Sequence, residues 1–277
     1  MFCYVQSAFV PRLSPLVPPG NTRASAVRGS RPNPHLRGLE RFFGPLTPHP
    51  AAGLDGVQVI FVCYTNRSGS NYLCEALAST GVLNLGEELL HGPLLVRTAI
   101  EERCHSVHEV IELLAPPRVR GGRLVIKAAL FHLEVLIRAG LLAAMMPHAM
   151  FIHIERVDRL AQAISFDIAD QTHSWTSLQA GRNDAGCGPS YSRERLVRLV
   201  RGFAEQNNQL DLFFGLNGIV PTHVLYERLI ADPAHEVAEI GAAIGLPDLG
   251  LDMGAIRLER QASARNHDWR ARYLSGA

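Results

Sequence analysis

An almost unbroken apolar run opens the regular part of the chain. Residues 57–64 are β-branched or aromatic at nearly every position, which is typical of a strand buried on both faces in a parallel sheet. A short polar turn follows at 65–70, and in residues 71–80 Leu73 and Leu77 stand four apart, as on one face of a helix. The pattern therefore predicts a strand, a polar loop and a helix in that order.

Short apolar runs continue to alternate with amphipathic stretches toward the C-terminus. They predict three more strands, at 124–128, 149–155 and 222–226, and three more helices, at 158–172, 191–216 and 232–244. Strands that alternate with helices indicate an α/β fold with a mostly parallel central sheet flanked by helices. Ligands of such folds bind at the carboxyl ends of the strands, where the polar loops of this chain also fall.

The N-terminal part differs in composition from the rest. Residues 1–50 hold nine of the 17 prolines and six arginines, with Glu40 as their one acidic residue, and they show no sustained period. We expect residues 1–52 to be a Pro/Arg-rich extension without regular structure and residues 53–277 to be the folded domain. A targeting peptide is the alternative, although Arg12 follows the apolar residues, which is the wrong order for a secretory signal.

Charge and cysteine content exclude several classes of protein. With 27 basic and 26 acidic residues the formal charge is +1, which by bulk charge excludes a nucleic-acid-coating protein. No stretch approaches the roughly 18 uncharged apolar residues of a membrane span. The five cysteines are scattered without a CxxC pair, which favours a reducing, cytoplasmic location and argues against zinc. His105 and His108, beside Cys104, have a ligand-compatible spacing, but without a fourth ligand nearby a solvated helix face is expected and no metal.

The loop after the first predicted strand has the composition of an anion site. Backbone N–H groups of a tight turn and the start of a helix attract negative charge. Ser68 and Ser70 add hydroxyl groups, Arg67 adds a guanidinium, and Gly69 allows a ligand to approach the backbone. The loop has no Walker lysine and is not a GxSxG elbow. An ordinary turn with a surface arginine is the alternative.

A second pair of polar residues follows the third predicted strand. Arg156 stands at the strand end and Ser165 two turns into the next helix. Together they suit a second phosphate in the same crevice. The alternative is a salt-bridged arginine and a buried serine.

Taken together, these segments resemble the sulfotransferases that use 3′-phosphoadenylyl sulfate (PAPS), and among them the bacterial trehalose 2-sulfotransferase-like family. The resemblance spans residues 56–274. It is carried by FVCYTNRSGSNYLCEALAST at 61–80, by Gly81-Val82 and Gly86 to Leu90, by RxDxxxQAxSF and QTxxW within 151–175, and by LERQA at 258–262 with Trp269 and Tyr273.

The resemblance implies a P-loop-like sulfotransferase fold and a set of roles. In-line transfer to an acceptor hydroxyl needs a base, and the resemblance gives that role to Glu88, whose pKa we expect burial to raise. Lys127, on the second predicted strand, matches a family lysine, and we expect Glu88, Arg67 and Lys127 to be the catalytic residues. The leaving group is a phosphate, so no metal is obligatory, and the family suggests a homodimer. The donor-binding residues implied are Arg67, Ser68, Gly69, Ser70 and Asn71 for the 5′-phosphosulfate, Arg156 and Ser165 for the 3′-phosphate, and Arg260 in a tail over the nucleotide.

Several alternatives stay open. Asn71 replaces a common threonine, and Leu89 and Leu90 replace an aromatic pair, which changes the expected wall of the acceptor pocket. The acceptor is therefore a carbohydrate such as trehalose or another small hydroxyl compound. Glu87 or His91 can replace Glu88 as the base. A nucleotide kinase of related topology and a non-catalytic relative are the rival functions; the missing Walker lysine opposes the first, and the intact residue set opposes the second.

Overall fold

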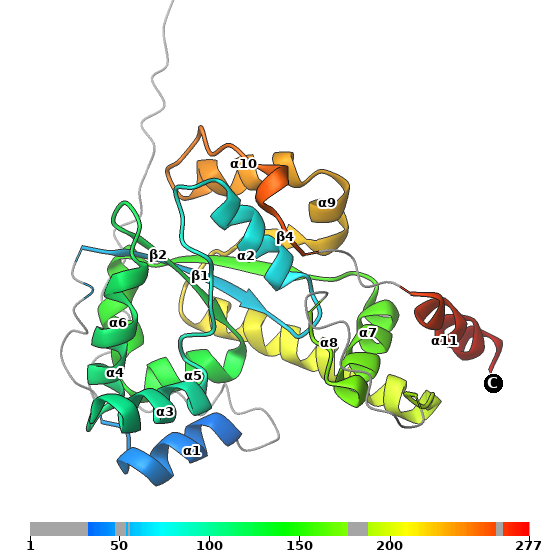
Figure 1. Cartoon of the computed structure of the whole chain (residues 1–277), viewed down its shortest axis with the longest axis horizontal. Helices are drawn as coiled ribbons and strands as arrows, with labels where there is room; N and C mark the ends of the chain where they lie inside the picture. The colour runs from blue at the N-terminus through cyan, green and yellow to red at the C-terminus, as the bar shows by residue number, and fades with distance from the viewer. Residues whose placement is uncertain (1–32, 48–53, 55, 177–187, 259–262, 277) are drawn as a thin grey trace, which may run out of the picture.

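The computed structural model describes residues 33–47, 54, 56–176, 188–258 and 263–276. A four-stranded parallel sheet with the order β2-β1-β3-β4 forms its centre (Figure 1). The strands are β1 (Gln58–Tyr64), β2 (Arg123–Ala128), β3 (Met150–Glu155) and β4 (Thr222–Leu225). The predicted α/β fold and all four predicted strands are confirmed.

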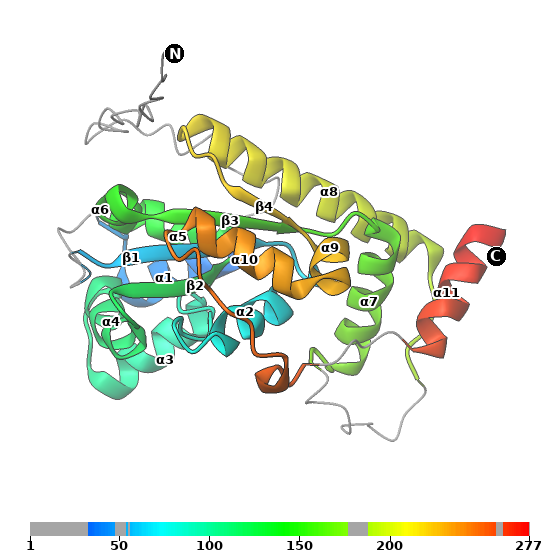
Figure 2. The same cartoon turned by 90° about the horizontal axis from the view of Figure 1, so that it is seen from above.

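Helices cover both faces of this sheet (Figures 1 and 2). The four predicted helices are confirmed as α2 (Ser70–Ser79), α7 (Arg159–Thr172), α8 (Arg193–Leu216) and α10 (Pro233–Ala243). The others are α1 (Pro34–Phe43), α3 (Gly92–Glu102), α4 (Val107–Leu114), α5 (Leu130–Arg138), α6 (Leu141–Met145), α9 (Tyr226–Ala231), α11 (Ala264–Ser275) and the short 3₁₀ turns η2 (Pro116–Arg118), η3 (Met146–His148) and η5 (Met253–Ala255).

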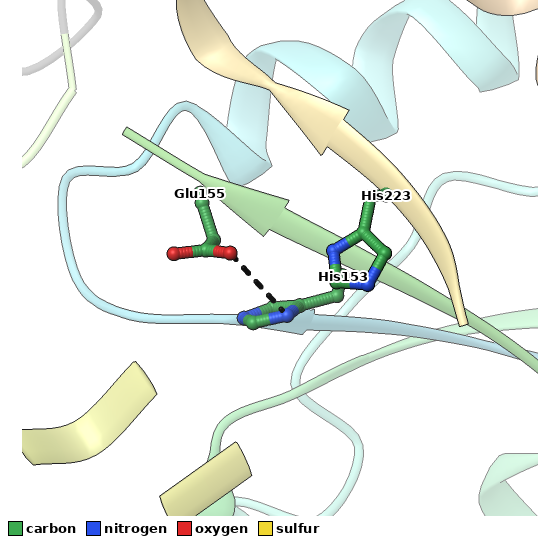
Figure 3. Close-up of side chains that lie close together, drawn as sticks. All are labelled: His153, Glu155 and His223. Atoms are coloured by element: carbon green, nitrogen blue, oxygen red, sulfur yellow. Dashed lines mark ion pairs between the residues drawn. The ribbon is translucent and has the colours of Figure 1, made fainter. Parts of the chain in front are cut away.

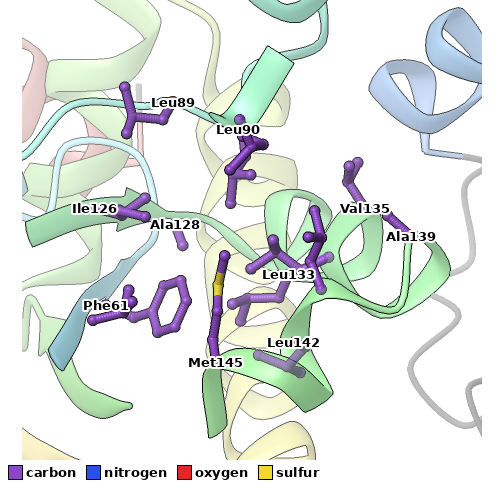
Figure 4. Packing of buried hydrophobic residues seen from close by; sticks show 14 of the residues in the cluster. Phe61, Leu89, Leu90, Ile126, Ala128, Leu133, Val135, Ala139, Leu142 and Met145 are labelled. Atoms are coloured by element: carbon purple, nitrogen blue, oxygen red, sulfur yellow. The ribbon is translucent and has the colours of Figure 1, made fainter. Parts of the chain in front are cut away.

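The central strand β1 is buried on both faces, as its sequence predicts. Ile60 and Val62 pack in a cluster with side chains of α2 and α10. Phe61, on the opposite face, belongs to a larger cluster that includes Leu133 of α5 and Phe213 of α8 (Figure 4). Alternate residues of one strand thus fill two separate cores, which fixes the register of the strand.

Helix α1 corrects the expectation for the N-terminal segment. Residues 34–43 were expected to lack regular structure, but they form a helix with Pro34 in its first turn and with Asn33 as its N-cap. Leu36 and Leu39, three residues apart, are buried in the same cluster as Phe61. Proline is compatible with the first helical turn because its missing N–H would have no helical partner there. The boundary at residue 52 stays a prediction, and residues 1–32 lie outside the described residues.

The described ranges hold no single helix that is both long and apolar enough to cross a membrane. One pair, α5 with Leu141–His148 beyond a 95° bend, meets the length and composition requirements when its two parts are taken together.

Candidate active site

A cavity of about 1030 Å³ lies where the strands end. Its volume is at the upper end of the roughly 300–1,000 Å³ of ligand pockets, which is room for a nucleotide and a small acceptor. Eight of the residues that the sequence selected line it: Arg67, Gly69, Ser70, Asn71, Glu88, Lys127, Arg156 and Ser165. Ser68 is fully buried and is not among the lining residues, and Arg260 lies outside the described residues.

The loop between β1 and α2 has a fixed and unusual backbone. Arg67 has φ +63° and Gly69 has φ +93°, both in the left-handed region. A side chain at Gly69 would also overlap the ring of Tyr226, so this position requires glycine for two reasons. From α7, Gln162 donates to Thr65 Oγ1 at 2.9 Å and to the carbonyl oxygen of Asn66 at 2.8 Å. Hydrogen bonds from α7 therefore hold the loop in this conformation.

The start of α2 offers backbone donors to the cavity. The N-cap Gly69 has no side chain and makes no capping bond, and the next residues, Ser70 to Tyr72, line the cavity. The first N–H groups of a helix have no intrahelical partner, and the helix dipole makes this end positive. An anion placed here would satisfy these donors.

Two arginines meet beside this helix terminus. Arg67 Nε donates to Ser165 Oγ at 2.8 Å, and Nη1 donates to the carbonyl oxygen of Trp175 at 2.5 Å. Arg156 stacks over the ring of Tyr226, with its guanidinium carbon 4.6 Å from the ring centre. Burial and the neighbouring charge of Arg156 lower the pKa of Arg67. Two cations in one half-buried site repel each other, and a bound polyanion would remove that repulsion.

The loop that carries Glu88 is attached to the edge of the sheet. The Asn84 side chain pairs with the backbone of Val125 in β2, accepting at 2.7 Å and donating at 3.0 Å. A Cβ at Gly86 would lie 2.7 Å from Cys74 Sγ, so glycine allows the loop to pack tightly there. The backbone carbonyl of Glu87 then accepts from Lys127 N at 2.9 Å. This extra pairing places the next residue, Glu88, above the end of β2.

Glu88 is the centre of a network of polar side chains. Tyr64 OH donates to Glu88 Oε1 at 2.5 Å, and Lys127 Nζ lies 3.0 Å from the same oxygen. Lys127 Nζ also donates to Asn71 Oδ1 and lies 4.7 Å from the Tyr64 ring centre. The network joins β1, β2, α2 and the Glu88 loop, and its cation and carboxylate balance each other.

The pKa of Glu88 differs from the expectation. Burial acts to raise it, as predicted, but the charge of Lys127 and hydrogen bonds from Tyr64 and Lys127 together bring the pKa below the usual value of a glutamate. Glu88 is therefore ionised at neutral pH, and it is a proton acceptor that does not need to lose a proton first.

The neighbours of Glu88 point in different directions. Glu87 Oε2 accepts from Arg118 Nε at 2.6 Å, and Glu87 does not line the cavity. His91 does line it. Leu89 and Leu90, expected in the acceptor wall, are instead fully buried in the core beneath the loop (Figure 4). Of the three candidate bases, Glu88 and His91 face the cavity.

The C-terminal helix α11 closes one side of the cavity. Arg270 Nη1 binds both carboxylate oxygens of Asp158, at 2.7 and 3.0 Å, and Asp158 also caps α7 by accepting from Ala161 N at 2.9 Å. Trp269 is buried against α7 and α8. Asn266, His267 and Arg270 line the cavity. A basic tail over the nucleotide was expected, with Arg260 as its binding residue. The α11 residues that line the cavity are different ones, and Arg260 itself lies outside the described residues.

Two aromatic residues at the carboxyl ends of strands were missed in the sequence. Tyr64 is the last residue of β1, and Tyr226 directly follows β4. Each was taken as part of an apolar strand, although each stands at a carboxyl end, where ligands of parallel sheets bind. Their position at the end of a predicted strand could have identified both tyrosines as candidate site residues.

A separate polar cluster lies outside the cavity. His153, Glu155 and His223 each offer one ligand atom, and these atoms lie within 4.8 Å of one another (Figure 3). His153 Nδ1 is 3.8 Å from Glu155 Oε1 and 3.5 Å from Asp211 Oδ1, while Glu155 Oε2 is held by Arg159 at 2.7 Å. Ligands of tetrahedral zinc are about 3.3 Å apart. We assign the cluster to packing around a buried histidine whose pKa burial lowers, because it does not line the cavity and the distance from His153 to Glu155 exceeds ligand spacing.

Comparison with known proteins adds three findings. The model of the Stf0 sulphotransferase family matches residues 122–275, which include Lys127, Arg156 and Ser165 and begin after Glu88. The trehalose 2-sulfotransferase of Mycobacterium tuberculosis (strain ATCC 35801 / TMC 107 / Erdman) is 32% identical over 129 residues, 46% of this chain and 46% of that protein. The match thus spans about half the length of the curated relative. A solved structure, the sulfotransferase domain from the Synechococcus PCC 7002 olefin synthase, has a TM-score of 0.40 and 16% sequence identity over 77% of this chain and 87% of that chain.

Proposed function

Since the chain belongs to the Stf0 sulphotransferase family, we propose that it transfers a sulfuryl group from PAPS to a hydroxyl of a carbohydrate or another small acceptor. One observation carries this proposal. The cavity is lined by two arginines and an open helix terminus, and also by the Glu88–Lys127 pair. The first set suits a donor with several negative charges, and the second suits removal of a proton from an acceptor.

The donor side has the right groups for two separate anions. We assign the 5′-phosphosulfate to the N–H groups of Ser70 and Asn71 and to Arg67. We assign the 3′-phosphate to Arg156 and Ser165. The bond between Arg67 Nε and Ser165 Oγ supports a continuous polar wall between the two positions. Ser68 has no part in this assignment because its side chain is fully buried.

The transfer step needs one proton acceptor and positive charge. The acceptor oxygen forms a bond to sulfur as the bond between sulfur and the phosphate oxygen breaks. The hydroxyl proton goes to Glu88, and 3′-phosphoadenosine 5′-phosphate (PAP) leaves. Lys127, 3.0 Å from Glu88, keeps the carboxylate ionised and adds positive charge beside the transferred group. The residues do this by position and charge, and the step we propose uses no metal.

The cellular expectations rest on other grounds. A homodimer follows from the resemblance to the family, and a cytoplasmic location follows from cysteine usage. Both stay predictions, as does the role of residues 1–52.

The donor assignment is tested by thermal unfolding with nucleotides and without metal. PAP at about one hundred times its Kd adds about 2.7 kcal/mol to the free energy of unfolding. We expect stabilisation by PAP, little by ADP or ATP, and loss of the PAP effect in Arg156→Ala. Stabilisation by ATP and ADP instead would favour a kinase, and no effect of any nucleotide would favour a non-catalytic relative.

A further inference from the structure

The cavity wall beside Glu88 is built by an unexpected part of the chain. His35 of α1, His91 and Phe131 line it in place of Leu89 and Leu90. We propose that α1 is part of the acceptor site, and that His35 Nε2–H binds a hydroxyl of a neutral sugar or similar polyol held over Glu88. This inference rests on the proposed sulfotransferase function and names the class of acceptor. The helix lies outside the segment 122–275 that matches the family model.

Helix α1 is fixed firmly to the elements around the cavity. Asn33 Oδ1 caps the helix by accepting from His35 N at 3.0 Å and Leu36 N at 3.1 Å. Its Nδ2 donates to the carbonyl oxygen of Phe131 and to Glu134 Oε2, both at 2.9 Å. One side chain thus starts α1 and ties it to α5. With Leu36 buried in the core, the helix holds His35 in a defined place.

The orientation of the His35 ring is also set. Gly92 N, at the start of α3, donates to His35 Nδ1 at 3.0 Å. The N-cap of α3, His91, makes no capping bond through its own side chain, so His35 supplies a cap from another helix. A Cβ at Gly92 would lie 3.2 Å from both Cα and Cβ of His35, so glycine permits this approach. The ring stacks on Phe131 with 4.4 Å between centres and 15° between planes.

This geometry determines which proton His35 carries. Burial, then the neighbouring His91, lower the pKa of His35, although Glu88 opposes them, so the ring is neutral near pH 7. A neutral ring that accepts through Nδ1 has its proton on Nε2. The ring therefore presents a hydrogen-bond donor on the edge away from Gly92, beside a cavity in which Glu88 is the proton acceptor.

The charges at this end favour a neutral acceptor. Lys127 is paired with Glu88 at 3.0 Å. His132, which stacks edge-on against Phe131, has its pKa lowered to about 3 by burial and is also uncharged. The two arginines are assigned to the donor. A sugar can pack its apolar C–H faces against the aromatic rings and bind the imidazole through a hydroxyl. Because a sugar is neutral, it places no unpaired charge against this wall.

Two substitutions of His35 separate its proposed role in acceptor binding from its structural hydrogen bond with Gly92 N. The amide oxygen of His35→Asn stands near the place of Nδ1, so this variant keeps an acceptor for Gly92 N but loses the Nε2–H donor. The amide of His35→Gln reaches the place of Nε2 and does the reverse. Steady-state kinetics would use PAPS with trehalose, glucose and myo-inositol, then whichever sugar is sulfated fastest. PAP affinity is measured by calorimetry, and stability by thermal unfolding.

We expect the acceptor KM to rise roughly 3- to 10-fold in His35→Asn, as for loss of one neutral hydrogen bond. His35→Gln should recover part of this loss, because it restores the donor without the orienting bond, and it should unfold at lower temperature. PAP affinity should be unchanged in both. An unchanged KM in His35→Asn would overturn the inference. So would PAP binding without sulfation of any neutral sugar, or a preference for glucose 6-phosphate over glucose. Failure of the wild type to bind PAP would instead refute the proposed function, and the inference with it.

Discussion

The hydrogen bond between Tyr64 and Glu88 has a measurable consequence for the pH dependence of the reaction. Tyr64 OH donates to Glu88 Oε1 at 2.5 Å and so stabilises the carboxylate over the carboxylic acid. This bond is one of the causes that lower the pKa of Glu88. Replacing Tyr64 with phenylalanine removes the donor and leaves the ring in place. The pKa of Glu88 should therefore rise in Tyr64→Phe.

The size of this rise follows from the bond and its exposure. A hydrogen bond to a charged group contributes about 1.5–3 kcal/mol, and about 1.4 kcal/mol correspond to one pKa unit. The Glu88 side chain is 35% exposed, so water replaces part of the lost bond. We discount the effect to about half, which leaves a preference for the carboxylate of about 0.7–1.5 kcal/mol that Tyr64→Phe removes. Lys127 remains in place, so the pKa should not rise further.

The assay is the pH profile of kcat/KM with PAPS and a saturable sugar acceptor. The base must be ionised, so activity falls as the pH drops through the pKa of Glu88, and this acid limb should move to higher pH in Tyr64→Phe. Tyr273→Phe is the matched control, because Tyr273 lies on α11 and its ring contacts Arg193. An acid limb at the same pH in Tyr64→Phe and wild type would refute either the role of this bond or the role of Glu88 as base.

Three further outcomes follow from the structure. Glu88→Ala should lower kcat by about 10²–10⁴ with little change in PAP affinity. Arg67→Ala should lower both kcat and PAP affinity. If calorimetry gave Arg67→Ala the PAP affinity of the wild type, the loop assignment would be contradicted. Gly69→Ala should lose PAP binding and about 1–3 kcal/mol of stability, because φ is +93° and the new methyl group overlaps Tyr226; a melting temperature equal to that of wild type would oppose this. His132 has a pKa of about 3 in the folded protein, against 6.5 when unfolded, so only the unfolded chain takes up its proton between these values. The free energy of unfolding should therefore fall as the pH drops through this range. Denaturant titrations of His132→Asn should show a weaker dependence of this free energy on pH.

The fold was predictable where local patterns coincide with burial. Residues 57–64 are apolar on both faces because β1 is covered on both sides, and the run alone reveals this. Helix α1 does carry local signals, although the prolines and arginines before it conceal them. Asn33 and Pro34 are a typical N-cap and first helical residue, and Leu36 and Leu39 stand three apart on the buried face. The sequence does not show that this face packs on α3 and α5, which lie far away in the chain.

The candidate site was predictable in its residue types but not in its geometry. The loop 65–70 indicates an anion site, but the sequence does not show that of the two buried serines only Ser70 lines the cavity, whereas Ser68 does not. The pKa of Glu88 depends on Tyr64 and Lys127, which only the sheet brings together. Burial by itself would have changed that pKa in the opposite direction.

The most direct test of the account is transfer of label from radiosulfur-labelled PAPS to a neutral sugar, with chelator present and Glu88→Ala as the control. We expect a sulfated sugar and an equimolar amount of PAP from the wild type, and a rate lower by about 10²–10⁴ in the variant. No sulfated product from the wild type, or equal rates from the two proteins, would contradict it.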